Sequence, residues 1–67
     1  MDRDRQLYKF SPREITIVQA LAIGKTDKEI ASMLKMSPKT VRWHLKTIRT
    51  KMGVKTRTAI VHKLLLP

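Results

Sequence analysis

Residues 24–46, GKTDKEIASMLKMSPKTVRWHLK, contain the features that decide the fold of this chain. Residues 26–29, TDKE, form a capping box, in which the hydroxyl and the carboxylate three residues later each accept a free backbone N–H at a helix start. Residues 37–38, SP, mark another start, with proline where its missing N–H costs nothing. Residues 35–37 alone separate the two predicted helices, which is too short a connection for an antiparallel return. The two helices should therefore cross steeply, as in a helix-turn-helix.

Start and stop signals outside this stretch predict two more helices. Residues 11–14, SPRE, form a second capping box, and Thr56 offers a cap for a last helix. Gly24 and Gly53 follow apolar residues, at the place that glycine takes just past a helix end. No stretch alternates apolar and polar residues for long enough to demand a strand. We therefore predict an all-α fold, a compact four-helix bundle containing a helix-turn-helix, with helices near 12–23, 27–34, 38–52 and 57–65.

The length and composition exclude several classes of protein. A chain of 67 residues is one domain at most, and a fold of this size buries about 60% of its unfolded surface, which disfavours a deep active site. The absence of cysteine excludes disulfides and cysteine-ligated zinc. No apolar run approaches the roughly 20 residues needed to span a bilayer, and no signal peptide is recognisable. We therefore expect a cytoplasmic protein with no membrane contact. Residues 1–9 are polar and should be a flexible N-terminal segment or linker remnant, with the domain at 10–67.

The distribution of charge indicates the kind of partner. The formal net charge is +10, and all five acids precede residue 30. After that point the chain carries nine positive residues without an acid among them: Lys35, Lys39, Arg42, Lys46, Arg49, Lys51, Lys55, Arg57 and Lys63. A solvated surface with no partner usually mixes the two signs. The pattern therefore favours a polyanion as the partner.

Helical spacing separates a predicted core from a predicted outer face. The expected core positions are Ile17, Val18, Leu21 and Ala22, then Ile30, Ala31 and Leu34, and then Val41, His44, Leu45, Ile48 and Met52. The opposite face of the helix predicted at 38–52 carries Lys39, Arg42, Trp43, Lys46, Arg49 and Thr50. A helix of this kind can pack on a core and lie against phosphates at the same time.

Motifs spread over residues 10 to about 65 match one known family. They are residues 11–14 (SPRE), 24–31 (GKTDKEIA), 36–41 (MSPKTV), His44 and residues 51–58 (KMGVKTRT). In order and spacing they resemble the LuxR-type, or GerE-type, DNA-binding domain of bacterial transcription regulators. The signal is specific because it is distributed along nearly the whole chain.

The resemblance implies a function and a set of contacts. The third helix, 38–52, would enter the major groove of double-stranded DNA to regulate transcription. Base-reading side chains would be Arg42, Trp43 and Lys46, and an arginine can bond guanine O6 and N7 together. Phosphate contacts would come from Lys28, Thr40, Arg49 and Arg57, with Lys39 added because it lies on the same predicted face.

The resemblance also implies partners. The fourth helix has more apolar residues than one buried face needs, and in this family it commonly forms the two-fold contact. We therefore expect a homodimer on DNA, with Ile60 and Leu64 at the dimer contact. A receiver or ligand-sensing domain is the further expected partner, unless the regulator is free-standing. No cofactor and no metal are expected.

Some residues have two interpretations. His44 lies on the apolar side of its helix, so we interpret it as a half-buried core residue rather than a base or metal ligand. Trp43 faces away from that side, and we expect it exposed near DNA rather than packed on a neighbouring turn. Lys35 stands where the family usually has glycine, and a positive φ there would cost modest strain. Ile15 and Ile23 would be either a contact with another domain or ordinary surface residues.

Rival functions make different predictions. A protein–protein interaction module would use the basic face to bind an acidic partner instead of DNA. A membrane-surface helix is disfavoured, because regularly placed caps and tight turns indicate a folded bundle. We do not expect an enzyme, since Glu14 and Glu29 are explained as caps and no nucleophile–base pair or phosphate loop is present.

Overall fold

The computed structural model describes residues 9–65 and contains four helices there: α2 (Pro12–Ala22), α3 (Asp27–Leu34), α4 (Pro38–Met52) and α5 (Arg57–Leu65). No strand occurs in this part of the chain, so the predicted all-α fold is confirmed. The bounds agree with the prediction except that α2 ends at Ala22, one residue early. Ile23, at φ −91° and ψ 9°, no longer has α-helical backbone angles, because the chain turns at Gly24. Of the N-terminal segment predicted at 1–9, only Lys9 lies within the described residues.

Side-chain caps start each of the first three helices where the sequence predicted them. In the α2 box, Glu14 N–H donates to Ser11 Oγ over 3.2 Å, and Ser11 N–H donates to Glu14 Oε1 over 2.7 Å. The α3 box between Thr26 and Glu29 repeats this pattern. At α4 the Ser37 hydroxyl accepts from the Thr40 N–H over 3.1 Å without a closing glutamate. Local hydrogen bonds thus set the helix starts.

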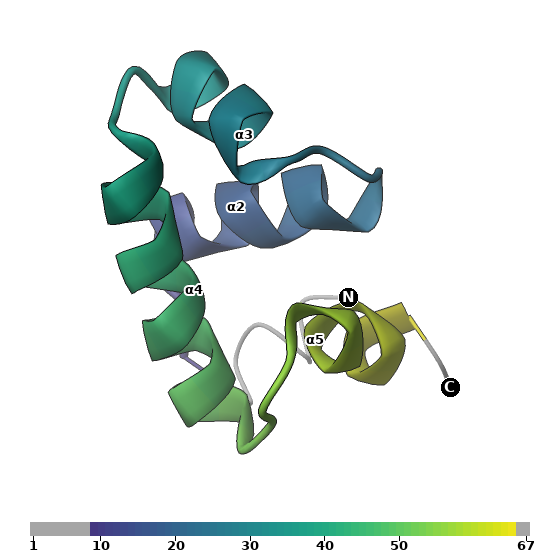
Figure 1. Ribbon diagram of the computed structural model, residues 1–67. Helices are drawn as coiled ribbons and strands as arrows, with labels where there is room; N and C mark the ends of the chain where they lie inside the picture. Colours follow the sequence, from purple (N-terminus) through teal and green to yellow (C-terminus); the bar gives the residue numbers. More distant parts are fainter. Residues whose placement is uncertain (1–8, 66–67) are drawn as a thin grey trace.

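The helices pack around α4, which runs along one side of the molecule in Figure 1. The short helix α3 lies at the N-terminal end of α4, α5 lies at its C-terminal end, and α2 passes between them. The α3–α4 connection turns sharply, as a helix-turn-helix requires. Among residues 9–65, this arrangement leaves the side of α4 that faces away from α2 uncovered.

The turn between α3 and α4 depends on an unusual backbone conformation at Lys35. Its φ of 55° and ψ of 47° lie in the left-handed region. The Met36 N–H reaches back to the Ala31 carbonyl over 3.0 Å, which closes the end of α3. The modest strain predicted for a lysine at a glycine position is therefore present.

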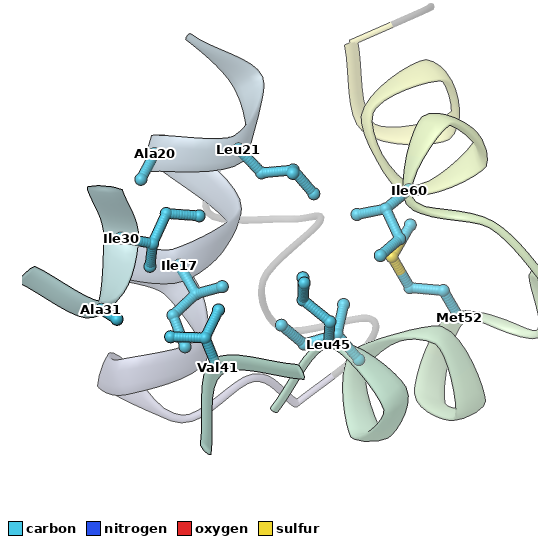
Figure 2. Close-up of a cluster of buried hydrophobic side chains, with 10 residues drawn as sticks. Ile17, Ala20, Leu21, Ile30, Ala31, Val41, Leu45, Met52 and Ile60 are labelled. Atoms are coloured by element: carbon cyan, nitrogen blue, oxygen red, sulfur yellow. The ribbon is translucent and has the colours of Figure 1, made fainter. Parts of the chain in front are cut away.

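One core joins all four helices. Its buried members are Ile17, Ala20, Leu21, Ile30, Ala31, Val41, Leu45, Ile48, Met52 and Ile60, most of which Figure 2 labels. Eight of these ten were predicted from helical spacing, the exceptions being Ala20 and Ile60. Three predicted core residues, Val18, Ala22 and Leu34, are only partly buried. His44 is half-buried at the edge of the core, as predicted.

Candidate nucleic-acid interface

The uncovered side of α4 is the candidate interface, and we call it the α4 outer face. Val41, Leu45 and Ile48 hold the opposite side of the helix in the core, each with 1% exposure or less. This anchoring turns the intervening residues outward. The α4 outer face consists of Lys39, Thr40, Arg42, Trp43, Lys46 and the half-exposed Arg49. The predicted base-reading residues Arg42, Trp43 and Lys46 therefore share one exposed surface.

Trp43 is the largest side chain of the α4 outer face and is 62% exposed. Its ring meets His44 edge-on, with the ring centroids 5.1 Å apart and an angle of 74° between the planes. The prediction that this residue faces solvent is confirmed.

Within residues 9–65 no group of three His, Asp or Glu side chains gathers as a metal site would require.

The acids that the structure describes are all engaged elsewhere. Glu29 accepts the Thr26 N–H over 2.8 Å, Glu14 pairs with Lys51, and Asp27 pairs with Arg57. No acid lies on α4 itself. The α4 outer face therefore presents positive charge with no carboxylate of its own helix to offset it.

An ion pair that spacing did not predict joins the C-terminal end of α4 to α2. Lys51 Nζ lies 2.6 Å from Glu14 Oε1, and it also donates to the Lys9 carbonyl over 3.4 Å. Burial on its own would raise the pKa of Glu14, but the Lys51 ammonium and the Ser11 N–H together lower that pKa below its ordinary value. The sequence identified Glu14 only as a cap, because no local pattern links residues so far apart.

A second ion pair joins the starts of α3 and α5. Arg57 Nη2 lies 2.8 Å from Asp27 Oδ1 and 2.9 Å from Oδ2, with the arginine side chain 44% exposed. Arg57, a predicted phosphate contact, is thus held by a carboxylate in the free protein. Lys28, another predicted phosphate contact, follows Asp27 in α3 and is exposed. The ion pair therefore holds the start of α3 against the start of α5.

The position of α5 contradicts one of the two predicted dimer contacts. Ile60 is fully buried in the core, so it cannot meet a second chain, and its assignment to a dimer surface was wrong. Leu64 is half-buried and packs against the core. The apolar surplus inferred from α5 also involves Leu65 and Leu66, whose side chains lie outside what the structure describes. A hollow of about 380 Å³ between α2 and α5 is lined by Leu21, Gly24, Lys25, Thr26, Arg57, Thr58 and Val61.

The steep α3–α4 crossing and the basic α4 outer face define a helix-turn-helix domain suited to a polyanion. Comparison with known families agrees: residues 8–64 match the model described as bacterial regulatory proteins, luxR family. The chain belongs to the LuxR family and is a DNA-binding domain of transcription regulation. This family is a regulator family rather than an enzyme family. None of the helices described is long and apolar enough to span a bilayer.

Curated relatives differ greatly in length. The spore germination protein GerE of Bacillus subtilis is 47% identical over 53 residues, covering 79% of this chain and 72% of that protein. The nitrate/nitrite response regulator protein NarP of Escherichia coli is 38% identical over 47 residues, covering 70% of this chain and 22% of that protein. The oxygen regulatory protein NreC of Staphylococcus aureus is 43% identical over 51 residues, covering 76% of this chain and 24% of that protein. The match thus spans most of GerE but about a quarter of the other two. No solved structure matches the chain.

Proposed function

We propose that this domain reads a specific sequence of double-stranded DNA by laying the α4 outer face in the major groove. The observation that carries this proposal is the division of α4 into a buried apolar side and an exposed basic side that includes Arg42, Trp43 and Lys46. A major groove about 12 Å wide admits one α-helix. Uncovered and free of acids, α4 is the helix available for that position.

The proposed contacts divide into base reading and positioning. Arg42 and Lys46 would donate to acceptors on base edges, guanine O6 and N7 in particular, and Trp43 would lie between them. Phosphates would be contacted by Lys28, Lys39, Thr40, Arg49 and Arg57. Such contacts fix the register of the protein on the duplex and carry little sequence information. For Arg57, a phosphate oxygen would take the place that the Asp27 carboxylate holds in the free protein.

Pairing on DNA is part of the proposal, with a smaller contact than the sequence suggested. Leu64 remains available because it is half-buried, whereas Ile60 is excluded by its burial. Two half-sites on one duplex would bring two copies together at high effective concentration. A sedimentation titration with a duplex carrying both half-sites should then saturate at two proteins per duplex. Saturation at one protein would contradict pairing.

The context of the domain is proposed from its relatives. NarP is named a response regulator and is several times longer than the matched segment, which supports a role as the output domain of a regulator with a receiver or sensor domain. GerE, most of whose length is matched, supports a free-standing regulator instead. In either case the domain would act on the bacterial chromosome, which places it in the cytoplasm.

Selection of binding sites from a random duplex pool tests the proposed function. We would perform it at about 100 mM salt, where phosphate contacts are screened but not abolished. Enrichment of a short motif, above all an inverted repeat, is the expected result. Binding without enrichment would refute sequence reading by this chain alone. Absence of binding even at low salt would favour the interaction module that binds an acidic protein.

A further inference from the structure

The exposed indole of Trp43 is the one feature of the α4 outer face that charge does not explain. It is the only tryptophan of the chain, and it leaves 62% of its surface in water. The other large apolar side chains exposed within residues 9–64 are Ile23 and Met33, and neither lies on α4. Covering an apolar ring of this size with another apolar group would gain free energy by removing both surfaces from water.

We propose that Trp43 packs against the 5-methyl group of a thymine in the major groove and so selects thymine at one position of the site. This inference rests on the proposed function, because it requires α4 to lie in that groove. Among the four base edges exposed there, thymine alone carries a methyl group, which is the largest apolar feature in the groove. Guanine, adenine and cytosine present hydrogen-bonding atoms, most of which the indole face cannot satisfy.

One neighbouring side chain contacts the ring of Trp43. His44 meets the ring edge-on at a centroid distance of 5.1 Å, which limits its movement toward the core. One turn further along α4, the Thr47 hydroxyl donates to the Trp43 carbonyl over 3.2 Å. That bond directs the Thr47 side chain back toward its own helix and away from the groove. A ring bounded by His44 on that edge can distinguish a methyl group from a hydrogen atom by contact area.

Hydrogen bonding by the indole is the competing role for Trp43. Its Nε1–H donates but cannot accept, so it could bond a purine N7 or thymine O4. Replacing thymine by deoxyuridine separates the two roles, because uracil keeps O4 and loses only the methyl. If Trp43 donates a hydrogen bond to O4, the protein should bind the thymine and uracil duplexes with equal affinity. If Trp43 packs on the methyl group, the affinity for the uracil duplex should be lower.

The experiment uses the motif recovered by site selection. Each thymine of the motif is replaced in turn by deoxyuridine, and Kd is measured by anisotropy of the labelled duplex for the wild type, Trp43→Ala and Met33→Ala. Met33→Ala is the matched control, because it removes an exposed apolar side chain outside α4. Circular dichroism verifies that each variant is folded, and the emission of the single tryptophan reports its exposure when the wild type binds.

At one position the wild type should lose about fourfold in affinity on replacement of thymine, as expected for one buried methyl group at roughly 0.8 kcal/mol. Trp43→Ala should show no preference for thymine over uracil there, while Met33→Ala should keep the wild-type ratio. The wild-type emission should move to shorter wavelength as the ring leaves water. Equal binding of thymine and uracil at every position would overturn this inference and leave the proposed function intact. Recovery of no motif would overturn both.

Discussion

Lys51 Nζ lies 2.6 Å from Oε1 of Glu14, and this contact joins the last turn of α4 to the first turn of α2. The carboxylate is almost fully buried and belongs to the α2 capping box, whereas the lysine side chain is 34% exposed. The pair therefore couples the start of one helix to the end of the candidate recognition helix. Lys63 adds to this end, since its Nζ donates to the Met52 carbonyl over 3.0 Å.

Lys51→Met should lower the free energy of unfolding by about 1–3 kcal/mol, because it leaves the buried Glu14 carboxylate without its cationic partner. The partial exposure of Lys51 keeps this value below that of a fully buried pair. Urea denaturation measures the loss. Lys55→Met is the control, since Lys55 is exposed outside the helices and should change stability little. Equal stabilities for the two variants would show that the ion pair adds nothing.

Stability should fall in acid because the folded pKa values of Glu14 and Glu29 lie below the ordinary 4.5. A carboxyl with a lowered folded pKa stabilises the fold fully above its unfolded pKa and loses this contribution as the pH falls through its folded pKa. The melting temperature should therefore decline as the pH drops below about 4.5. Glu14→Gln should flatten this decline, and an unchanged slope in that variant would rule out Glu14 as a source.

Arg42→Ala should weaken binding to the selected site by about 1–3 kcal/mol while changing binding to random duplex much less. Arg57→Ala should weaken both to a similar extent, because a phosphate contact carries no sequence information. Competition titrations of both duplexes at one salt concentration give the two ratios. Equal losses on both duplexes for Arg42→Ala would remove Arg42 from the base-reading role.

Lys35→Gly should raise the free energy of unfolding by about 0.5–1 kcal/mol. The lysine occupies the left-handed region at φ 55°, which costs a residue with a Cβ more than it costs glycine. The larger backbone entropy of glycine in the unfolded chain offsets part of the gain. Thermal unfolding followed by circular dichroism measures the change, with Lys39→Gly inside α4 as a destabilised comparison. A loss of stability in Lys35→Gly would contradict strain at this turn.

Ile60→Val should destabilise the domain by about 0.5–1.5 kcal/mol, since it removes one methylene group from the core. The stoichiometry on a duplex with two half-sites should not change. Leu64→Ala should instead weaken the second binding event, if the half-buried Leu64 takes part in pairing. Sedimentation of both variants on the same duplex separates the effects. Loss of pairing in a fully folded Ile60→Val would contradict the assignment of Ile60 to the core.

The sequence predicted the helices accurately but assigned α5 poorly. Capping boxes and glycines gave bounds within one residue, because the hydrogen bonds involved join residues only three to five positions apart. On α5 the apolar residues lie on most sides of the helix, so spacing alone could not say which of them faces inward. The packing of α5 against α2 and α4 buries Ile60 in the core, although the sequence analysis had assigned Ile60 to a dimer surface.

The sequence by itself determined the helix starts, the sharp α3–α4 turn and the two-sided character of α4, since each depends on neighbours along the chain. The tertiary structure alone decided that Glu14 meets Lys51 from 37 residues away and that Asp27 meets Arg57 from 30 residues away. No local pattern encodes such pairs, because any of the many lysines and arginines could have supplied the cation. Burial of the core brings these helix ends together, and only then does the choice of partner become definite.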